Sequence, residues 1–250
     1  RRLSARPGPG GIFLRLALYV EHRLIFTETP GTQRKGIILC VLGASAVRPN
    51  HLDSGKVSMK AMLLKEICDL KQNRTPLVYT DVPDPEAGEG EVVLRVTACG
   101  VCHTELDEIE GRTPPEELPV IPGHQVVGEV VATGSGVRDL RNGDRVGVAW
   151  IYSACGRCEH CRRGEENLCA EFKATGRDAH GGYAEYMKVA EGFAHRIPDV
   201  FRDVEAAPLL CAGAIGHRSL RLTGIENGQL LGLTGFGASA HLVLKAVGQA

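Results

Sequence analysis

Four cysteines fall within fifteen residues in the second half of the chain, in the pattern C-x2-C-x2-C-x7-C. They are Cys155, Cys158, Cys161 and Cys169. Thiolates two residues apart can turn back onto one ion, and nearby glycines give the backbone the freedom that such turns require. A Zn²⁺ ion held by four sulfurs is tetrahedral and coordinatively closed, with no position left for a substrate. The spacing therefore predicts a structural zinc lobe over residues 155–169.

The alternative for this loop is a set of disulfides or free thiols. Disulfide frameworks belong to small secreted domains, and this 250-residue chain shows no recognisable secretory signal. Nine cysteines, several at metal-ligand spacing, fit a reducing compartment better. His160 could replace one sulfur, but four cysteines already complete the shell. We therefore expect a cytoplasmic protein that binds zinc.

The composition argues against two classes of partner. The chain is 43% hydrophobic and 24% charged, with a net charge of −1, so it can bury a sizeable core and has no excess of basic residues. No apolar run approaches the ~20 residues that a membrane-spanning helix needs. We expect a protein that binds neither nucleic acid nor a membrane.

Residues 1–58 differ from the rest of the chain. They carry nine Lys and Arg against three Asp and Glu, which leaves twenty against twenty-seven for the remainder. They show no sustained helical or strand period, and Met59 looks like a natural start. We predict an atypical extension outside the fold. The alternative is a basic arm or an organellar targeting peptide, since such peptides are Arg-rich and acid-poor.

From Met59 onward the chain shows many short strand patterns separated by glycine-rich turns. This texture favours an antiparallel, barrel-like β domain. After residue 203 the period lengthens to that of a helix, with a break near Pro208. The expected strands cover residues 60–64, 77–82, 91–97, 126–132, 145–149, 181–189 and 229–233, and the expected helices cover residues 203–222 and 239–247.

Three further motifs carry groups that could bind a metal. They are Cys99-Gly100-Val101-Cys102-His103-Thr104-Glu105, Pro122-Gly123-His124-Gln125 and Leu209-Leu210-Cys211-Ala212-Gly213. Each alone has an ordinary explanation, because free cysteine is often buried and a loop histidine can simply be hydrogen-bonded. For Cys211 alone, a core position is the better interpretation. Together with the four-cysteine lobe, the three motifs are far more specific.

Taken together, these motifs resemble those of the zinc-dependent alcohol dehydrogenases in the medium-chain dehydrogenase/reductase family. The resemblance runs from about Met59 to Ala250. It implies a mixed α+β and α/β fold. A GroES-like β-barrel catalytic domain would cover residues 59–212, and the start of a Rossmann doubly wound domain residues 213–250. It also implies two Zn²⁺ ions per subunit, with NAD or NADP as the cofactor.

The resemblance also assigns roles to individual residues. In this family two cysteines and one histidine hold the catalytic zinc, and a fourth position stays open for water or a substrate oxygen. The matching ligands are Cys102, His124 and Cys211. Thr104 matches the hydroxyl that accepts the alcohol proton, and His103 matches a residue near the cofactor phosphates. Cys99 is then expected to pack beside the site.

Three positions depart from the family pattern. Gln125 stands where a Glu usually follows the ligand histidine, and this neutral amide is expected to alter ligand exchange more than metal binding. Asp107 replaces a histidine at the end of the proton relay, so we expect proton release through Asp107 or directly to water. Glu105 replaces an Asp that orients the ligand histidine, which is a conservative change.

The segment Gly235-Phe236-Gly237-Ala238-Ser239-Ala240 has the form G-x-G-x-x-A. The family places its nicotinamide-cofactor fingerprint here, so Gly235, Gly237 and Ala240 are expected to bind the cofactor. A glycine turn that only packs a helix is the alternative. The acidic residue that binds the adenosine ribose is expected about 20 residues further on. That position lies past Ala250, so we expect a C-terminally truncated chain.

The resemblance implies an oxidoreductase that moves a hydride between an alcohol or aldehyde and a nicotinamide ring. It implies a homo-oligomer for the full-length protein. One alternative is a polyol or secondary-alcohol dehydrogenase of the same family. Others are an inactive fragment and a non-catalytic zinc-binding module such as a nucleic-acid-binding ribbon. The acidic charge of residues 59–250 argues against the ribbon, because nucleic-acid binding relies on a basic face.

Overall fold

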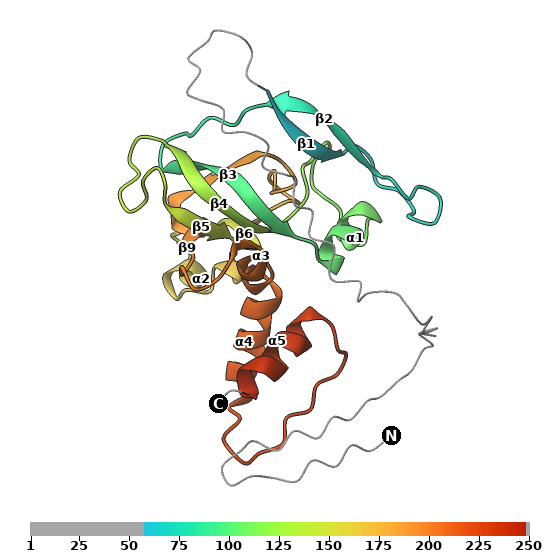
Figure 1. Ribbon diagram of the computed structural model, residues 1–250, viewed down its shortest axis with the longest axis vertical. Coiled ribbons are helices and arrows are strands. Elements are labelled where there is room, and N and C mark those ends of the chain that lie inside the picture. Colours follow the sequence, from blue (N-terminus) through green and yellow to red (C-terminus); the bar gives the residue numbers. More distant parts are fainter. Residues whose placement is uncertain (1–57, 249–250) are drawn as a thin grey trace. The chain divides into compact units, whose positions relative to one another are not determined.

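The computed structural model describes residues 58–248 (Figure 1), so the expectations for residues 1–57 lie outside the described residues. Within this range, contacts between residues divide the chain into two compact units. We call residues 58–211 the sheet unit and residues 212–248 the helical unit. All described strands belong to the sheet unit, whereas the described part of the helical unit contains two helices.

A five-stranded antiparallel sheet forms the centre of the sheet unit. Its strands are β3 (Glu91–Gly100), β4 (Gln125–Thr133), β5 (Arg145–Val148), β8 (Tyr186–Ala190) and β9 (Ala194–Arg196). Their order across the sheet is β8-β3-β4-β5-β9. The two longest strands, β3 and β4, pair from Val92 opposite Thr133 to Gly100 opposite Gln125.

Two register shifts curl this sheet (Figure 1). The register of β3 against β4 shifts between Val93 and Leu94, and again between Val96 and Ala98. Shifts of this kind bend a strand and increase its twist. The sheet therefore curves around its core as half of a barrel, which confirms the barrel-like β domain predicted from the sequence.

The core of the sheet unit is aliphatic. Val92 and Leu94 lie two residues apart on β3, so their side chains point to the same face, and both are completely buried. Val126 and Val130 form the matching face of β4. The buried face predicted for residues 91–97 is confirmed, with Val96 only partly buried at its edge.

Smaller elements complete the sheet unit. The strand β1 pairs with β2, and β6 pairs with β7. Single bridges from Ala61 to Ala184 and from Leu64 to Val120 tie β1 to other segments. These strands are β1 (Ser58–Leu64), β2 (Leu77–Pro83), β6 (Ile151–Ser153) and β7 (Lys173–Ala174). The helices are α1 (His103–Ile109), α2 (Glu159–Arg162) and α3 (Asp203–Ala206), with 3-10 turns η1 (Glu166–Leu168), η2 (Glu191–Phe193) and η3 (Ala207–Leu210).

The helical unit contains α4 (Ala212–Thr223) and α5 (Ala238–Val247), which pack on each other. Gly216 allows the close approach, because a Cβ at this position would lie 2.8 Å from Val243 Cγ2. The helix expected over residues 239–247 is confirmed. The expected break near Pro208 is also confirmed, since η3 separates α3 from α4.

Two expected strands need correction. Only β8 forms a ladder within the expected strand 181–189, because the preceding backbone bonds to a different segment. Gly182 N donates to the Gly123 carbonyl at 2.9 Å, and Tyr183 N donates to the Pro122 carbonyl at 3.0 Å. Residues 229–233 form no strand, because a strand needs a neighbour to satisfy its N–H and C=O groups and the described part of the helical unit offers none.

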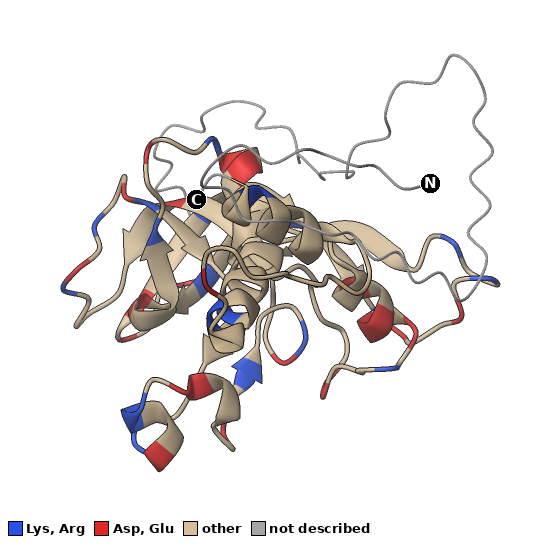
Figure 2. Cartoon of the chain, turned by 90° about the horizontal axis from the view of Figure 1, so that it is seen from below, with Lys and Arg blue, Asp and Glu red and all other residues tan. Residues whose placement is uncertain are grey.

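Charged residues of both signs are interspersed over the described chain (Figure 2). Many form exposed ion pairs across neighbouring elements, such as Lys60 with Asp81 and Arg95 with Glu129. Pairs of this exposure contribute little stability individually, so the fold depends mainly on the aliphatic core. Between residues 58 and 248, no helix is both long enough and apolar enough to cross a bilayer.

Leu94→Ala should lower the free energy of unfolding by about 2–5 kcal/mol, because it removes a completely buried side chain from the centre of the core. The urea unfolding midpoint measures this loss. Tyr79→Ala is the control, since Tyr79 is 57% exposed on β2. Equal losses in the two variants would contradict the placement of the core.

Candidate metal and catalytic site

Strand register brings two of the expected metal ligands together. Gly100 at the end of β3 pairs with Gln125 at the start of β4. Cys102 lies two residues beyond Gly100, and His124 lies one residue before Gln125. Both residues are therefore at the same end of the β3–β4 pair.

The third expected ligand reaches the same place from a distant part of the sequence. Cys211 directly follows η3, and the donor atoms of Cys102, His124 and Cys211 all lie within 4.8 Å of one another. Two sulfurs and one imidazole nitrogen suit Zn²⁺ and leave one of its four positions open. The sheet unit thus holds a cluster that could bind a catalytic metal ion.

Gly123 fixes the approach to His124. Its φ of +99° is accessible mainly to glycine. A Cβ here would lie 2.6 Å from the Tyr183 ring and 2.9 Å from Cys99 Sγ. Cys99 is buried and packs against this turn, as expected, and it is not part of the donor cluster.

The carboxylate of Glu105 orients the imidazole of His124 through its Nδ1 atom. His124 Nδ1 lies 2.6 Å from Glu105 Oε1, and both side chains are almost completely buried. Glu105 Oε2 accepts a 2.7 Å hydrogen bond from Cys102 N at the start of α1. With Nδ1 engaged by Glu105, His124 Nε2 is the nitrogen left to face the two cysteine sulfurs and a metal.

The electrostatics of the cluster favour a metal cation. Hydrogen bonding to Cys211 and His124 lowers the pKa of Cys102 to about 3, so this thiol is a thiolate at neutral pH. The same thiolate, together with burial, raises the pKa of Cys211. Burial lowers the pKa of His124, but the adjacent Cys102 and Glu105 raise it to about 9. Metal binding therefore displaces protons that these residues otherwise hold.

The expected relay residues lie on α1, next to Cys102. The Thr104 hydroxyl is 3.5 Å from Cys102 Sγ. His103 is largely exposed, with Nε2 3.7 Å from Asp107 Oδ1. Asp107 also contacts Arg112 Nε at 2.5 Å. Thr104 thus lies beside the metal cluster, whereas His103, Asp107 and Arg112 form a separate polar group towards the surface of α1.

The four-cysteine lobe forms a second cluster. The sulfurs of Cys155, Cys158, Cys161 and Cys169 all lie within 4.8 Å of one another. Backbone N–H groups donate to them, including Cys158 N to Cys155 Sγ at 3.4 Å. Such donors lower the pKa of Cys155 to about 6. His160 instead faces Glu165 at 3.2 Å. The lobe could hold a metal through four sulfurs.

The expected cofactor residues belong to the helical unit. Gly235 has a φ of +76°, and Gly237 directly precedes α5. For both glycines, no described residue other than the adjacent ones has an atom within 4 Å of the position that a Cβ would occupy, so the described chain leaves the turn open on that side. Ala240 lies in the first turn of α5. This arrangement leaves room for a ligand at the turn.

Sequence reasoning missed the role of Trp150. Its ring meets the His124 ring edge-on, with centroids 5.0 Å apart, and the Arg177 guanidinium lies 5.5 Å from the centroid of the Trp150 ring. Trp150 therefore forms an aromatic wall beside the metal cluster. No spacing in the sequence indicates this contact, because strand pairing creates it.

Glu108 was also missed, although it lies one helical turn after Glu105. It is almost completely buried, and neither of its carboxyl oxygens has a hydrogen-bond partner among residues 58–248. Burial, reinforced by the charge of Glu105, raises the pKa of Glu108 to about 8. The i, i+3 spacing of two acids on one short helix was the available signal.

Comparison with known proteins identifies the family. Residues 88–199 match the alcohol dehydrogenase GroES-like domain. A Mycobacterium tuberculosis protein named "Probable alcohol dehydrogenase AdhA" is 51% identical over 173 residues, which are 67% of this chain and 49% of that protein. Residues 88–199 therefore belong to the alcohol dehydrogenase GroES-like domain family. The resemblance predicted from the cysteine and histidine motifs is confirmed, and so is the GroES-like β domain.

Solved structures of alcohol dehydrogenases and related reductases share this fold. The cobalt- and zinc-bound thermostable alcohol dehydrogenase of Pyrobaculum aerophilum is 26% identical, with a TM-score of 0.69 over 76% of this chain and 56% of that one. Acetophenone reductase of Geotrichum candidum, in complex with NAD, is 28% identical, with a TM-score of 0.64 over 78% and 57% of the two chains. The chain spans about half the length of the curated alcohol dehydrogenases it matches.

Glu105→Ala should weaken metal binding at the Cys102 cluster about 10- to 100-fold, because His124 and the Cys102 backbone both lose their acceptor. Titration with Co²⁺, followed by its absorption, measures the affinity. Glu110→Ala is the control, an acid near the end of α1 that pairs with Arg112. Equal loss of metal from the four-cysteine lobe would indicate general misfolding and contradict the assignment.

Glu108→Gln should flatten the pH dependence of stability. The pKa of Glu108 is higher in the folded chain than in the unfolded chain, so its contribution falls as pH rises from about 4.5 towards 8. Glutamine does not titrate. The melting temperature at about pH 5 and pH 8 should therefore differ less in the variant than in the wild type. Parallel pH profiles would contradict this account of Glu108.

Proposed function

We propose that this chain forms the zinc-binding catalytic part of an alcohol dehydrogenase. The enzyme transfers a hydride between an alcohol or aldehyde and a nicotinamide cofactor, NAD or NADP. The convergence of Cys102, His124 and Cys211 carries this proposal, because three segments remote in sequence place two sulfurs and one imidazole around a common point. The chain's family membership supports it.

The residues present fit a catalytic zinc. His124 is buried with its Nε2 on the side of the two cysteine sulfurs, and Cys102 is already disposed to be a thiolate. Zinc bound here would act as a Lewis acid toward an alcohol or carbonyl oxygen. The Pyrobaculum relative, which binds zinc, is consistent with this choice of metal.

The side chains around the cluster supply orientation and proton transfer. Glu105 fixes the tautomer and plane of the His124 ring. The Thr104 hydroxyl, beside Cys102 Sγ, would take the proton of a bound alcohol. Asp107, in contact with His103 and Arg112, is the next acceptor towards solvent. The wall formed by Trp150 excludes water from one side of His124.

The four-cysteine lobe holds the second zinc, with a structural role. Four sulfurs complete a tetrahedral shell, and the N–H groups that donate to them favour the thiolates that zinc requires. The eight cysteines of the described residues are all free thiols, which supports a reducing compartment such as the cytoplasm.

Residues 213–250 are the opening of a Rossmann cofactor domain in this proposal, after a catalytic domain that ends at residue 212. The turn at Gly235 and Gly237 before α5 is suited to a pyrophosphate at a helix N-terminus, with Ala240 packed in the first turn. His103 would contribute near the cofactor phosphates. The NAD bound to the Geotrichum reductase supports a nicotinamide cofactor, and we propose a homo-oligomer for the whole protein.

Elemental analysis of the purified, chelator-washed protein tests the proposal. We expect two zinc ions per chain in the wild type and one in Cys102→Ala. Cys99→Ala is a matched control, because Cys99 is a buried cysteine of the same segment outside the donor cluster, and it should keep both ions. Two ions in Cys102→Ala would contradict the catalytic site.

An activity assay tests the proposed hydride transfer separately from metal binding. Oxidation of an alcohol with NAD or NADP, followed by nicotinamide absorbance, should be lost in Cys102→Ala and kept in Cys99→Ala. Activity that persists in Cys102→Ala would contradict the proposed mechanism.

A further inference from the structure

The geometry points to Arg145 as the residue that positions Cys211 for metal binding. This inference rests on the metal site proposed above and goes beyond it. Arg145 touches none of the metal ligands in the described contacts. It acts through the segment of residues 197–210, which ends directly before Cys211.

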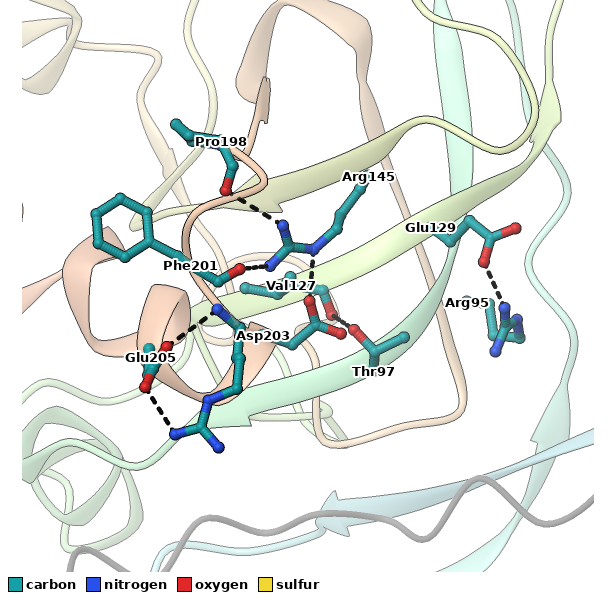
Figure 3. Close-up of polar contacts among 10 residues, drawn as sticks. Arg95, Thr97, Val127, Glu129, Arg145, Pro198, Phe201, Asp203 and Glu205 are labelled. Carbon is teal, nitrogen blue, oxygen red and sulfur yellow. Dashed lines mark hydrogen bonds and ion pairs between the residues drawn. The ribbon is translucent and has the colours of Figure 1, made fainter.

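Arg145, at the start of β5, makes three polar contacts with this segment (Figure 3). Its Nε lies 2.5 Å from Asp203 Oδ1, at the beginning of α3. One terminal nitrogen donates to the Pro198 carbonyl at 3.3 Å, and the other donates to the Phe201 carbonyl. A guanidinium can serve several acceptors in fixed directions, whereas an ammonium acts as a point charge. Arg145 therefore fixes the direction of the chain as it enters α3.

Gly147, the next residue on the same face of β5, makes room for the other end of the segment. Gly147 lies two residues after Arg145, so it faces the same side of the strand. A Cβ on Gly147 would lie 2.8 Å from both Ile197 Cδ1 and Leu210 Cδ2. The missing side chain makes room for Leu210, the residue before Cys211.

Small residues complete this docking surface. Ala206 and Ala207 are buried against Ala98 of β3 and Val127 of β4. Val127 is paired with Gly147 across β4 and β5. The segment thus rests on three adjacent strands, with Arg145 as its polar anchor.

The same strands position the other two ligands. His124 directly precedes β4, and Cys102 lies just beyond β3. Docking of α3 and η3 on this surface therefore sets where Cys211 lies relative to His124 and Cys102. Loss of the Arg145 contacts would free the entry to α3 and allow Cys211 to move away from the other donors.

Arg95 provides a matched control on the same sheet (Figure 3). It pairs with Glu129 across β3 and β4 at 2.5 Å, the same distance as the pair of Arg145 and Asp203. Both partners of the Arg95 pair are more exposed, and neither has a described contact with residues 197–211. Loss of that ion pair tests the effect of removing an arginine salt bridge that has no described contact with residues 197–210 before Cys211.

The test uses Co²⁺ titration of Arg145→Gln, Asp203→Asn and Arg95→Gln in the full chain. Thiolate-to-Co²⁺ absorption reports on both clusters. A Cys102→Ala background isolates the lobe signal. We expect Arg145→Gln and Asp203→Asn to weaken binding at the Cys102 cluster about tenfold or more, with lower thiolate absorption as Cys211 is lost from the site. The lobe and Arg95→Gln should bind as in the wild type.

Each outcome decides one question. Equal affinity in Arg145→Gln and the wild type would overturn the role of Arg145 and leave the metal site intact. Parallel weakening at both clusters would overturn positioning in favour of general destabilisation. Arg145→Lys covers the case in which Arg145→Gln fails to fold. Lysine keeps the positive charge, so this variant should weaken Co²⁺ binding at the Cys102 cluster less than Arg145→Gln does. No Co²⁺ at the Cys102 cluster in the wild type would instead sink the proposed function.

Discussion

The pairing of β3 with β4 is the constraint on which the candidate site depends. Its last pair, Gly100 with Gln125, sets Cys102 and His124 at one end of the sheet before any metal is present. A shift of this register by one residue would turn every core side chain of β3 to the other face. The aliphatic core that holds the register therefore also positions two of the proposed metal ligands. Glu105 adds the remaining restraint by bonding to both of them.

Much of this arrangement could be predicted from the sequence, because the signals that specify it act between residues close in sequence. The cysteine spacing of the lobe, the short strand patterns and the glycine at position 123 each act within a few residues. The proximity of Cys211 to Cys102, by contrast, was available only through family resemblance. The contacts of Trp150 and Arg145 were not predicted, since they arise from the packing of segments remote in sequence.

The wrong predictions have a common cause. Residues 229–233 have the apolar composition of a strand, but a strand exists only where a neighbour accepts its hydrogen bonds. Residues 181–185 likewise bond to the turn at Pro122 and Gly123 rather than continuing β8. In both cases the local pattern was compatible with a strand, and the surrounding chain decided the outcome.

The two candidate metal clusters, the four-cysteine lobe and the Cys102 cluster, differ in how much of the chain must be folded before each can form. The lobe collects its sulfurs from one short loop, so closing it costs little chain entropy and can precede the sheet. The Cys102 cluster needs β3, β4 and the segment before Cys211 in their final places. Loop closure over long separations is a late event in folding. During synthesis on the ribosome, the four sulfurs of the lobe can therefore come together while the chain is still emerging, whereas the second cluster forms only after the sheet has assembled.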